Sequence, residues 1–242
     1  MNGNNMRSSG NPWLVLRDRA VFWDTVRRRE SLLRVDLALV LFIVAASAAY
    51  GAVLAGWRSP RLSLYVAVKL PLLLLGTMCI VAVLNWVTAT LFRSGLGFGQ
   101  TLAVTFGAMS VSCWILLSLI PVTAFFTFFV AERSGSHDEM RLTHNYLLMT
   151  HILLIALAGL AGNSALRTGL RSVVAPTCEV HGLYGAWILA FAVVGCQLSW
   201  ILRPFVGSPF YPVVFMRPEC LERNFYEFVF TEVLPYMFGL RS

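Results

Sequence analysis

Long apolar stretches separated by short polar segments dominate this chain. Each stretch carries almost no charge and no acidic residue. Each is also long enough to cross a hydrocarbon core of about 30 Å, which takes roughly 20 residues of α-helix. The sequence therefore predicts an all-α polytopic membrane protein, built as a bundle of five transmembrane helices. The predicted spans are residues 37–56, 64–92, 101–131, 146–166 and 183–202.

The composition agrees with a membrane protein. The chain is 57% hydrophobic and 13% charged, with a mean hydropathy of +0.70, whereas about a quarter of the residues of a soluble domain are charged. One soluble core cannot hide so large an apolar share, because small domains leave much of their chain at the surface. We divide the chain into an N-terminal segment (1–35), a five-helix transmembrane domain (36–205) and a polar-aromatic tail (206–242).

The third stretch, residues 101–131, is too long for one straight span and has Pro121 in its second half. Proline removes a backbone donor and clashes with the preceding helical turn. We favour one kinked, tilted span, because a proline kink accounts for the extra length. A pair of short re-entrant helices is the alternative.

Arginines cluster ahead of the first predicted span, and the net charge of the chain is +7. Basic residues beside a first span favour the cytoplasmic side, so we expect a cytoplasmic N-terminus in a multi-pass protein of the cell inner (plasma) membrane. Five spans then put the tail outside. Anchoring at the membrane is the simplest role for this cluster, and we expect no nucleic-acid partner. The arginines are Arg7, Arg17, Arg19, Arg27, Arg28, Arg29 and Arg34.

Both flanking segments predict amphipathic structure at the membrane surface. In residues 11–35, Trp13 and Trp23 alternate with arginines, a combination typical of an interfacial helix; a docking segment is the alternative. In the tail, a helix is expected from Pro218, because proline and acidic residues suit a first helical turn. We expect this helix to cap the bundle or to lie on the membrane, and we favour the capping role.

Few polar side chains lie inside the predicted spans, and they are the candidate functional residues because burying them in lipid is costly. Lys69, the only lysine of the chain, precedes Pro71. Snorkelling to the interface is the favoured interpretation of Lys69, and contact with a substrate or a lipid phosphate is the alternative. Asn85, Asn163 and Gln197 are expected to form interhelical hydrogen bonds worth about 1 kcal/mol or less each. No acidic residue lies in a predicted span, which disfavours a carboxylate-driven transporter.

Histidines and cysteines do not predict a metal or cofactor site. His137, His144 and His151 recur every seven residues, which separates them by about 10 Å along a helix, too far for one ion. Only His151 lies well inside a span, and we expect it to bond to a neighbouring helix. Cys178 and Cys220 fall on opposite sides of the membrane in this topology and are not expected to pair. No CxxC, GxSxG or HExxH pattern occurs, so we expect no enzyme, no catalytic residue, no metal and no cofactor.

Several short motifs are spread along the predicted bundle. They are Tyr50-Gly51, Lys69-Leu70-Pro71, the glycine-rich turn into Gln100-Thr101-Leu102-Ala103, the long span around Pro121, and the tail segments 202–209 and 224–227. Together they resemble the bacterial branch of the Yip family, five-span proteins first known as partners of Ypt/Rab GTPases. The resemblance covers roughly residues 36–230 and implies a five-helix bundle with a cytoplasmic N-terminus. Eukaryotic members act in membrane traffic, but their Asp-Leu-Tyr-Gly-Pro motif is absent ahead of the first span, so Rab binding is not carried over.

Two functions remain. We favour a non-enzymatic integral membrane protein that organises membrane or scaffolds a membrane complex, with the lipid bilayer as partner and other membrane proteins or a homo-oligomer as further partners. The alternative is a small transporter or channel whose path uses Lys69, Asn85, Asn163 and Gln197. The two functions differ in whether these side chains converge on one cavity or lie scattered. A lipid-modifying enzyme would need a histidine beside a carboxylate at the membrane interface.

Overall fold

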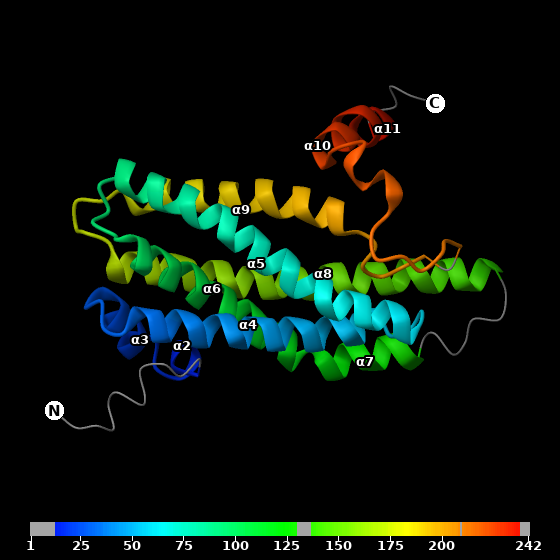
Figure 1. Ribbon diagram of the computed structural model, residues 1–242, viewed down its shortest axis with the longest axis horizontal. Coiled ribbons are helices and arrows are strands. Elements are labelled where there is room, and N and C mark those ends of the chain that lie inside the picture. The colour runs from blue at the N-terminus through cyan, green and yellow to red at the C-terminus, as the bar shows by residue number, and fades with distance from the viewer. Residues whose placement is uncertain (1–12, 130–136, 209, 238–242) are drawn as a thin grey trace.

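The computed structural model describes residues 13–129, 137–208 and 210–237, and every regular element in these ranges is helical (Figure 1). Five of the helices are long and apolar enough to cross a membrane. The shortest of them has 21 residues, which is about 32 Å at 1.5 Å per residue. This confirms the predicted fold class, a bundle of five membrane-spanning helices. The five are α4 (Leu32–Ala55), α5 (Pro60–Leu91), α6 (Phe98–Ser118), α8 (His137–Val173) and α9 (Val180–Leu202).

The long helices run alternately in opposite directions, and they define two ends of the bundle (Figure 1). We call the N-terminal end the one that holds the connections 92–97 and 174–179. We call the tail end the one that holds the connection 56–59 and the start of the tail after Leu202. The first described residues lie at the N-terminal end and the tail lies at the opposite end, as an odd number of spans requires. Which end faces the cytoplasm stays a prediction.

Close helix packing depends on two glycines. α4 packs between α5 and α6, and α6 also packs on α8. A Cβ atom added at Gly51 of α4 would lie 2.6 Å from the carbonyl oxygen of Val66 in α5, and one added at Gly162 of α8 would collide with the Ser112 hydroxyl of α6. Small residues let helix backbones approach where water is absent and packing drives association. In contrast, α9 packs mainly on α5 and touches α8 little.

The third predicted span is one broken helix. α6 ends at Ser118, Leu119 forms a turn, and α7 (Ile120–Phe129) continues toward the tail end, where it packs on α4 (Figure 1). The break lies just before Pro121, whose missing N–H and ring disturb the turn that precedes it. The chain therefore crosses the bundle in a single direction, as the kinked-span interpretation has it, and does not form a re-entrant pair.

Two short helices, α2 (Leu14–Arg17) and α3 (Arg19–Arg27), precede the first span. Phe22 and Trp23 are buried. Their rings fit against glycines of two spans: a Cβ atom at Gly107 would lie 2.9 Å from the Phe22 ring, and one at Gly169 would lie 2.6 Å from the Trp23 ring. The apolar face that was expected to meet lipid is thus covered by α6 and α8, which favours the docking alternative for this segment.

The tail folds back over its end of the bundle before it forms helices. Val206 is buried in a core cluster with Leu62 and Leu147 of two spans. The helix expected from Pro218 is only a short 3-10 turn, and the regular helix begins after Asn224, whose side-chain oxygen accepts a hydrogen bond from the Glu227 N–H at 2.7 Å. That N-cap fixes the start. The tail elements are η2 (Pro218–Leu221), α10 (Phe225–Phe228), η3 (Val229–Val233) and α11 (Leu234–Met237), and the last three stand beside the end of α9 (Figure 1).

Candidate functional site

A cavity of about 290 Å³ lies inside the bundle between α5, α6, α8 and α9. Asn85 of α5 and Asn163 of α8 both line it, so two of the five candidate residues meet at one site. The remaining wall is mainly apolar. Besides the asparagines, the lining includes Thr105, Ser112, Leu74, Met109, Ile155 and Phe191.

The cavity opens sideways toward the surrounding lipid. Ile155 of α8 lines the cavity and is 44% exposed at the bundle surface. Ala192 of α9 lines it as well and is also exposed. Because α8 and α9 touch little, the gap between them forms the mouth. In a bilayer, this mouth faces acyl chains.

Asn85 places an unsatisfied acceptor beside the cavity. Its side-chain nitrogen donates to the Thr105 hydroxyl at 3.5 Å, the outer limit of a hydrogen bond. Its side-chain oxygen is buried and has no hydrogen-bond partner. Leaving a buried acceptor unpaired costs about 1–3 kcal/mol. The interhelical bond expected for Asn85 is present, but it uses only one side of the amide.

Two glycines of α8 shape the wall in different ways. Gly162 has no room for a side chain, because Ser112 of α6 lies against it. Gly159 also lines the cavity, but a Cβ atom added there would meet nothing within 4 Å. The backbone of α8 at Gly159 therefore borders open space, and this glycine contributes directly to the width of the cavity.

Lys69 lies apart from the cavity and does not snorkel. Its side chain is fully buried in α5, and its ammonium group donates to the carbonyl oxygen of Pro204 at 3.0 Å. The rings of Phe205 and Phe215 lie 5.9 Å and 5.1 Å from the ammonium nitrogen, within range of cation–π attraction. The Lys69 ammonium therefore does not extend into water as snorkelling predicts, because the tail covers it and supplies both a carbonyl and aromatic faces.

Gln197 connects α9 to the tail helix. Its side-chain oxygen accepts from the Phe225 N–H at 3.0 Å. Two further bonds join the same elements: Tyr226 donates to the Val193 carbonyl at 2.6 Å, and Trp200 donates to the Arg223 carbonyl at 2.8 Å. Gln197 thus positions the tail and does not face the cavity.

His151 belongs to a separate buried group between α4, α7 and α8. Its Nδ1 lies 3.5 Å from the Tyr50 hydroxyl, and its Nε2 is buried with no hydrogen-bond partner. The hydroxyls of Thr123 and Thr127 in α7 are also buried, and Thr123 lies beside the Tyr50 hydroxyl. The expected contact of His151 with a neighbouring helix is present. Neither threonine stands out in the sequence, because only the packing of α7 on α4 and α8 buries them.

One buried carboxyl group was also missed. The first long helix begins at Leu32, not near residue 37, and it therefore contains Asp36. Asp36 is buried, and one of its carboxyl oxygens has no hydrogen-bond partner. The statement that no acidic residue lies in a span is wrong for this position, because hydrophobic patterning placed the start of the helix one turn too late.

The fold defines the chain as an integral membrane protein with five candidate spans and a cavity between four of them. Comparison with protein-family models, with curated proteins and with solved structures finds no match to this chain. Among the described residues, no three His, Cys, Asp or Glu side chains are placed to hold a metal ion. The cavity offers an apolar wall and a few amide and hydroxyl groups.

Proposed function

We propose that this protein is a non-catalytic integral membrane protein that organises the bilayer by holding a lipid in the cavity between α5, α6, α8 and α9. One observation carries the proposal: the cavity is apolar, lies within membrane-spanning helices and opens between α8 and α9. Acyl chains are the most concentrated apolar molecules at that opening. Dispersion and shape, rather than charge, would select the occupant.

The polar groups narrow the class of lipid. The side-chain oxygen of Asn85 is a hydrogen-bond acceptor that has no partner among the described residues of the protein. Asn163 adds a second amide to the same wall. A lipid that carries a hydroxyl or amide donor near one end of an apolar chain would satisfy the Asn85 oxygen. A purely hydrocarbon segment would leave it unpaired, at the cost already given. We therefore infer a preference for lipids with such a donor.

A transporter or channel path is the less favoured function. Of the four residues expected to line it, only Asn85 and Asn163 share the cavity. Lys69 is covered by the tail, and Gln197 is bonded to the tail helix. These contacts join the side chains to two separate parts of the tail, away from the cavity.

Family and location belong to the same proposal. The five-helix count and the opposite positions of the N-terminal helices and tail are compatible with the bacterial branch of the Yip family and with a plasma-membrane protein whose N-terminus is cytoplasmic. Other membrane proteins or a second copy of the chain are further proposed partners. The exposed apolar side chains of α9, such as Leu189 and Val193, offer a surface for them within the membrane.

Photo-crosslinking to lipid tests the lipid-holding function. The protein is placed in nanodiscs that contain a phospholipid with a photoactivatable acyl chain, and labelled residues are mapped by mass spectrometry. We expect labels on cavity residues that are not exposed at the bundle surface, such as Leu74 of α5 and Met109 of α6. Gly159→Leu places a side chain at the cavity wall, where an added Cβ atom meets nothing within 4 Å, and should reduce these labels to background.

Gly185→Leu is the matched control. Gly185 lies in α9 outside the cavity lining, and a Cβ atom added there also meets nothing within 4 Å. Its labelling pattern should equal that of the unchanged chain. Equal cavity labelling in Gly159→Leu and Gly185→Leu would mean that lipid contacts only the outer surface of the bundle, and the proposal would be abandoned.

A further inference from the structure

A second cavity, of about 200 Å³, lies at the tail end of the bundle, between the start of α5 and the folded-back tail. It is separate from the lipid cavity in the bundle, and the two share no lining residue. Arg58 and Arg217 line it, and none of the described residues in its lining is acidic. Its walls also include the Ser208 and Tyr211 side of the tail and Leu62 of α5.

Hydrogen bonds and a close backbone approach hold the tail at this cavity. Trp57 donates to the Val206 carbonyl at 2.8 Å, and Arg58 donates through Nε to the Ser208 carbonyl at 3.4 Å. Gly207 has a positive φ of 73°, and a Cβ atom there would collide with Leu62. Only glycine adopts this conformation readily. The wall of the cavity is therefore formed by a tail segment that is held in one shape.

The second guanidinium comes from farther along the tail. Arg217 lies 5.3 Å from the centre of the Tyr211 ring, and Tyr211 itself is exposed. Ring and guanidinium attract each other at this distance. Tyr211 therefore supports the side chain of Arg217 from the outer side, while Arg58 approaches from the connection between α4 and α5.

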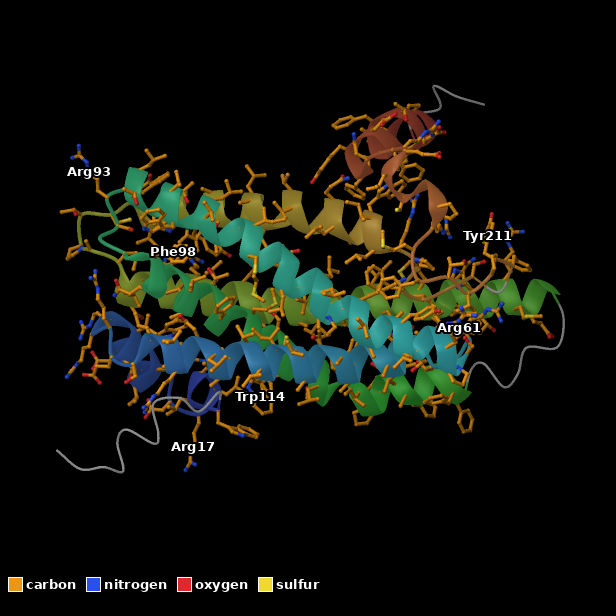
Figure 2. The ribbon with its side chains drawn as sticks, in the orientation of Figure 1. Arg17, Arg61, Arg93, Phe98, Trp114 and Tyr211 are labelled. Carbon is orange, nitrogen blue, oxygen red and sulfur yellow. The ribbon has the colours of Figure 1, made fainter. Side chains whose placement is uncertain are left out.

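The cavity lies beside the ends of two candidate membrane spans. Arg58 follows the last residue of α4 by three positions, and Ser59 caps the start of α5. Arg61 and Tyr211 lie at this same end of the bundle, far from Arg93 at the other end (Figure 2). Aromatic and arginine side chains gather at the level of lipid headgroups in membrane proteins. A charged group that enters this cavity from the bilayer therefore comes from a headgroup.

We propose that this cavity binds the phosphate of an anionic phospholipid headgroup. A guanidinium presents several N–H donors in a plane that matches phosphate oxygens, and two of them around one anion give a charge-assisted site. Basic pockets at the membrane boundary recognise anionic headgroups in this way. The proposal goes beyond the lipid-holding function, because it concerns another cavity and another part of the lipid, and either one can fail without the other.

Headgroup-selective binding in nanodiscs tests the proposal. Native mass spectrometry of the full chain compares retention of phosphatidylglycerol with that of phosphatidylcholine, and free inorganic phosphate is added as a competitor. We expect selective retention of phosphatidylglycerol. Replacing both arginines in Arg58→Gln/Arg217→Gln should weaken it by about tenfold or more for each guanidinium lost.

Two further variants keep the outcome interpretable. Arg217→Gln alone leaves the hydrogen bonds of the tail to Trp57 and Arg58 in place, so it tests the charge without unfolding the wall. Arg223→Gln removes an arginine that lies in the tail but does not line the cavity, and it should bind like the unchanged chain. Equal losses in Arg217→Gln and Arg223→Gln would reduce the effect to general surface charge and overturn the proposal. Displacement by millimolar inorganic phosphate would assign the site to a soluble phosphate and overturn the lipid source.

Discussion

The ammonium group of Lys69 donates a hydrogen bond to the carbonyl oxygen of Pro204, 135 residues later in the chain. This bond joins the second long helix to the first turn of the tail, and the two flanking phenylalanine rings shield it. A buried charge persists in a protein only when it is paired or hydrogen-bonded. The only lysine of the chain therefore acts within the fold as an attachment point for the tail.

Lys69→Met should release the tail and leave the bundle folded. Methionine fills a similar volume, and it removes a buried charge together with the group that bonds to Pro204, so the free energy of unfolding should change by less than about 1.5 kcal/mol. Limited proteolysis should cut residues 203–218 faster than in the unchanged chain. Arg61→Met, which removes an exposed charge at the same end, is the control and should keep the original cleavage rate. Aggregated Lys69→Met protein would show instead that the bond supports the whole bundle.

Gly51→Ala should separate α4 from α5. The added methyl group would lie 2.6 Å from the Val66 carbonyl oxygen. Because this oxygen belongs to the backbone, it can move away only if the whole helix shifts. Such overpacking costs about 1–3 kcal/mol. Thermal unfolding in detergent, followed by loss of monodisperse protein, measures this cost. Gly185→Ala makes the same chemical change where nothing lies within 4 Å and should be neutral or slightly stabilising. Equal melting temperatures for the two variants would contradict the close contact.

The orientation of the chain in the membrane can be tested by labelling cysteines that are introduced at exposed positions. Cys178 and Cys220 lie at opposite ends of the chain's five-helix core, but both are buried. In intact cells stripped of any outer envelope, Leu221→Cys, at a position that is 78% exposed in the tail, should react with a membrane-impermeant reagent. Glu30→Cys, at an exposed position before the first span, should react only after permeabilisation. The reverse pattern would invert the proposed orientation.

The reactivity of Cys178 should rise steeply with pH. Burial, together with the neighbouring charge of Glu179, raises the pKa of this thiol above its usual value. Only the thiolate reacts, so at neutral pH the reactive fraction is small, and it grows about tenfold per pH unit up to the raised pKa. Stopped-time labelling of solubilised protein between neutral and alkaline pH measures this rise. A rate that levels off at or below the usual thiol pKa of about 8.5 would contradict the raised pKa.

Hydrophobic patterning was sufficient for the five spans but not for their surroundings. The apolar runs and Pro121 predict which segments cross and where one of them breaks, because these properties are local. Whether a polar side chain such as Lys69 meets lipid, water or protein depends on the tail, which the pattern assigns only to the surface. The burial of Phe22 and Trp23 likewise depends on glycines in distant helices. The sequence of the N-terminal segment itself gives no sign of these glycines.

The candidate site was predictable only in part, for the same reason. Polarity inside an apolar run correctly singled out Asn85 and Asn163, since such residues are costly to bury. That they meet at one cavity depends on the gap between α8 and α9, which single-helix patterns do not encode. The arginine cavity was not predicted at all, because Arg58 and Arg217 are far apart in the sequence and each is ordinary in its own segment.

The bond between Lys69 and Pro204 also has a consequence for the order of biosynthesis. The helix with Lys69 is the second span to be made, whereas its acceptor carbonyl follows the fifth. While the intervening spans are synthesised, the ammonium group must rely on other partners, since Pro204 does not yet exist. A chain that stalls before residue 204 would keep this lysine without its final acceptor.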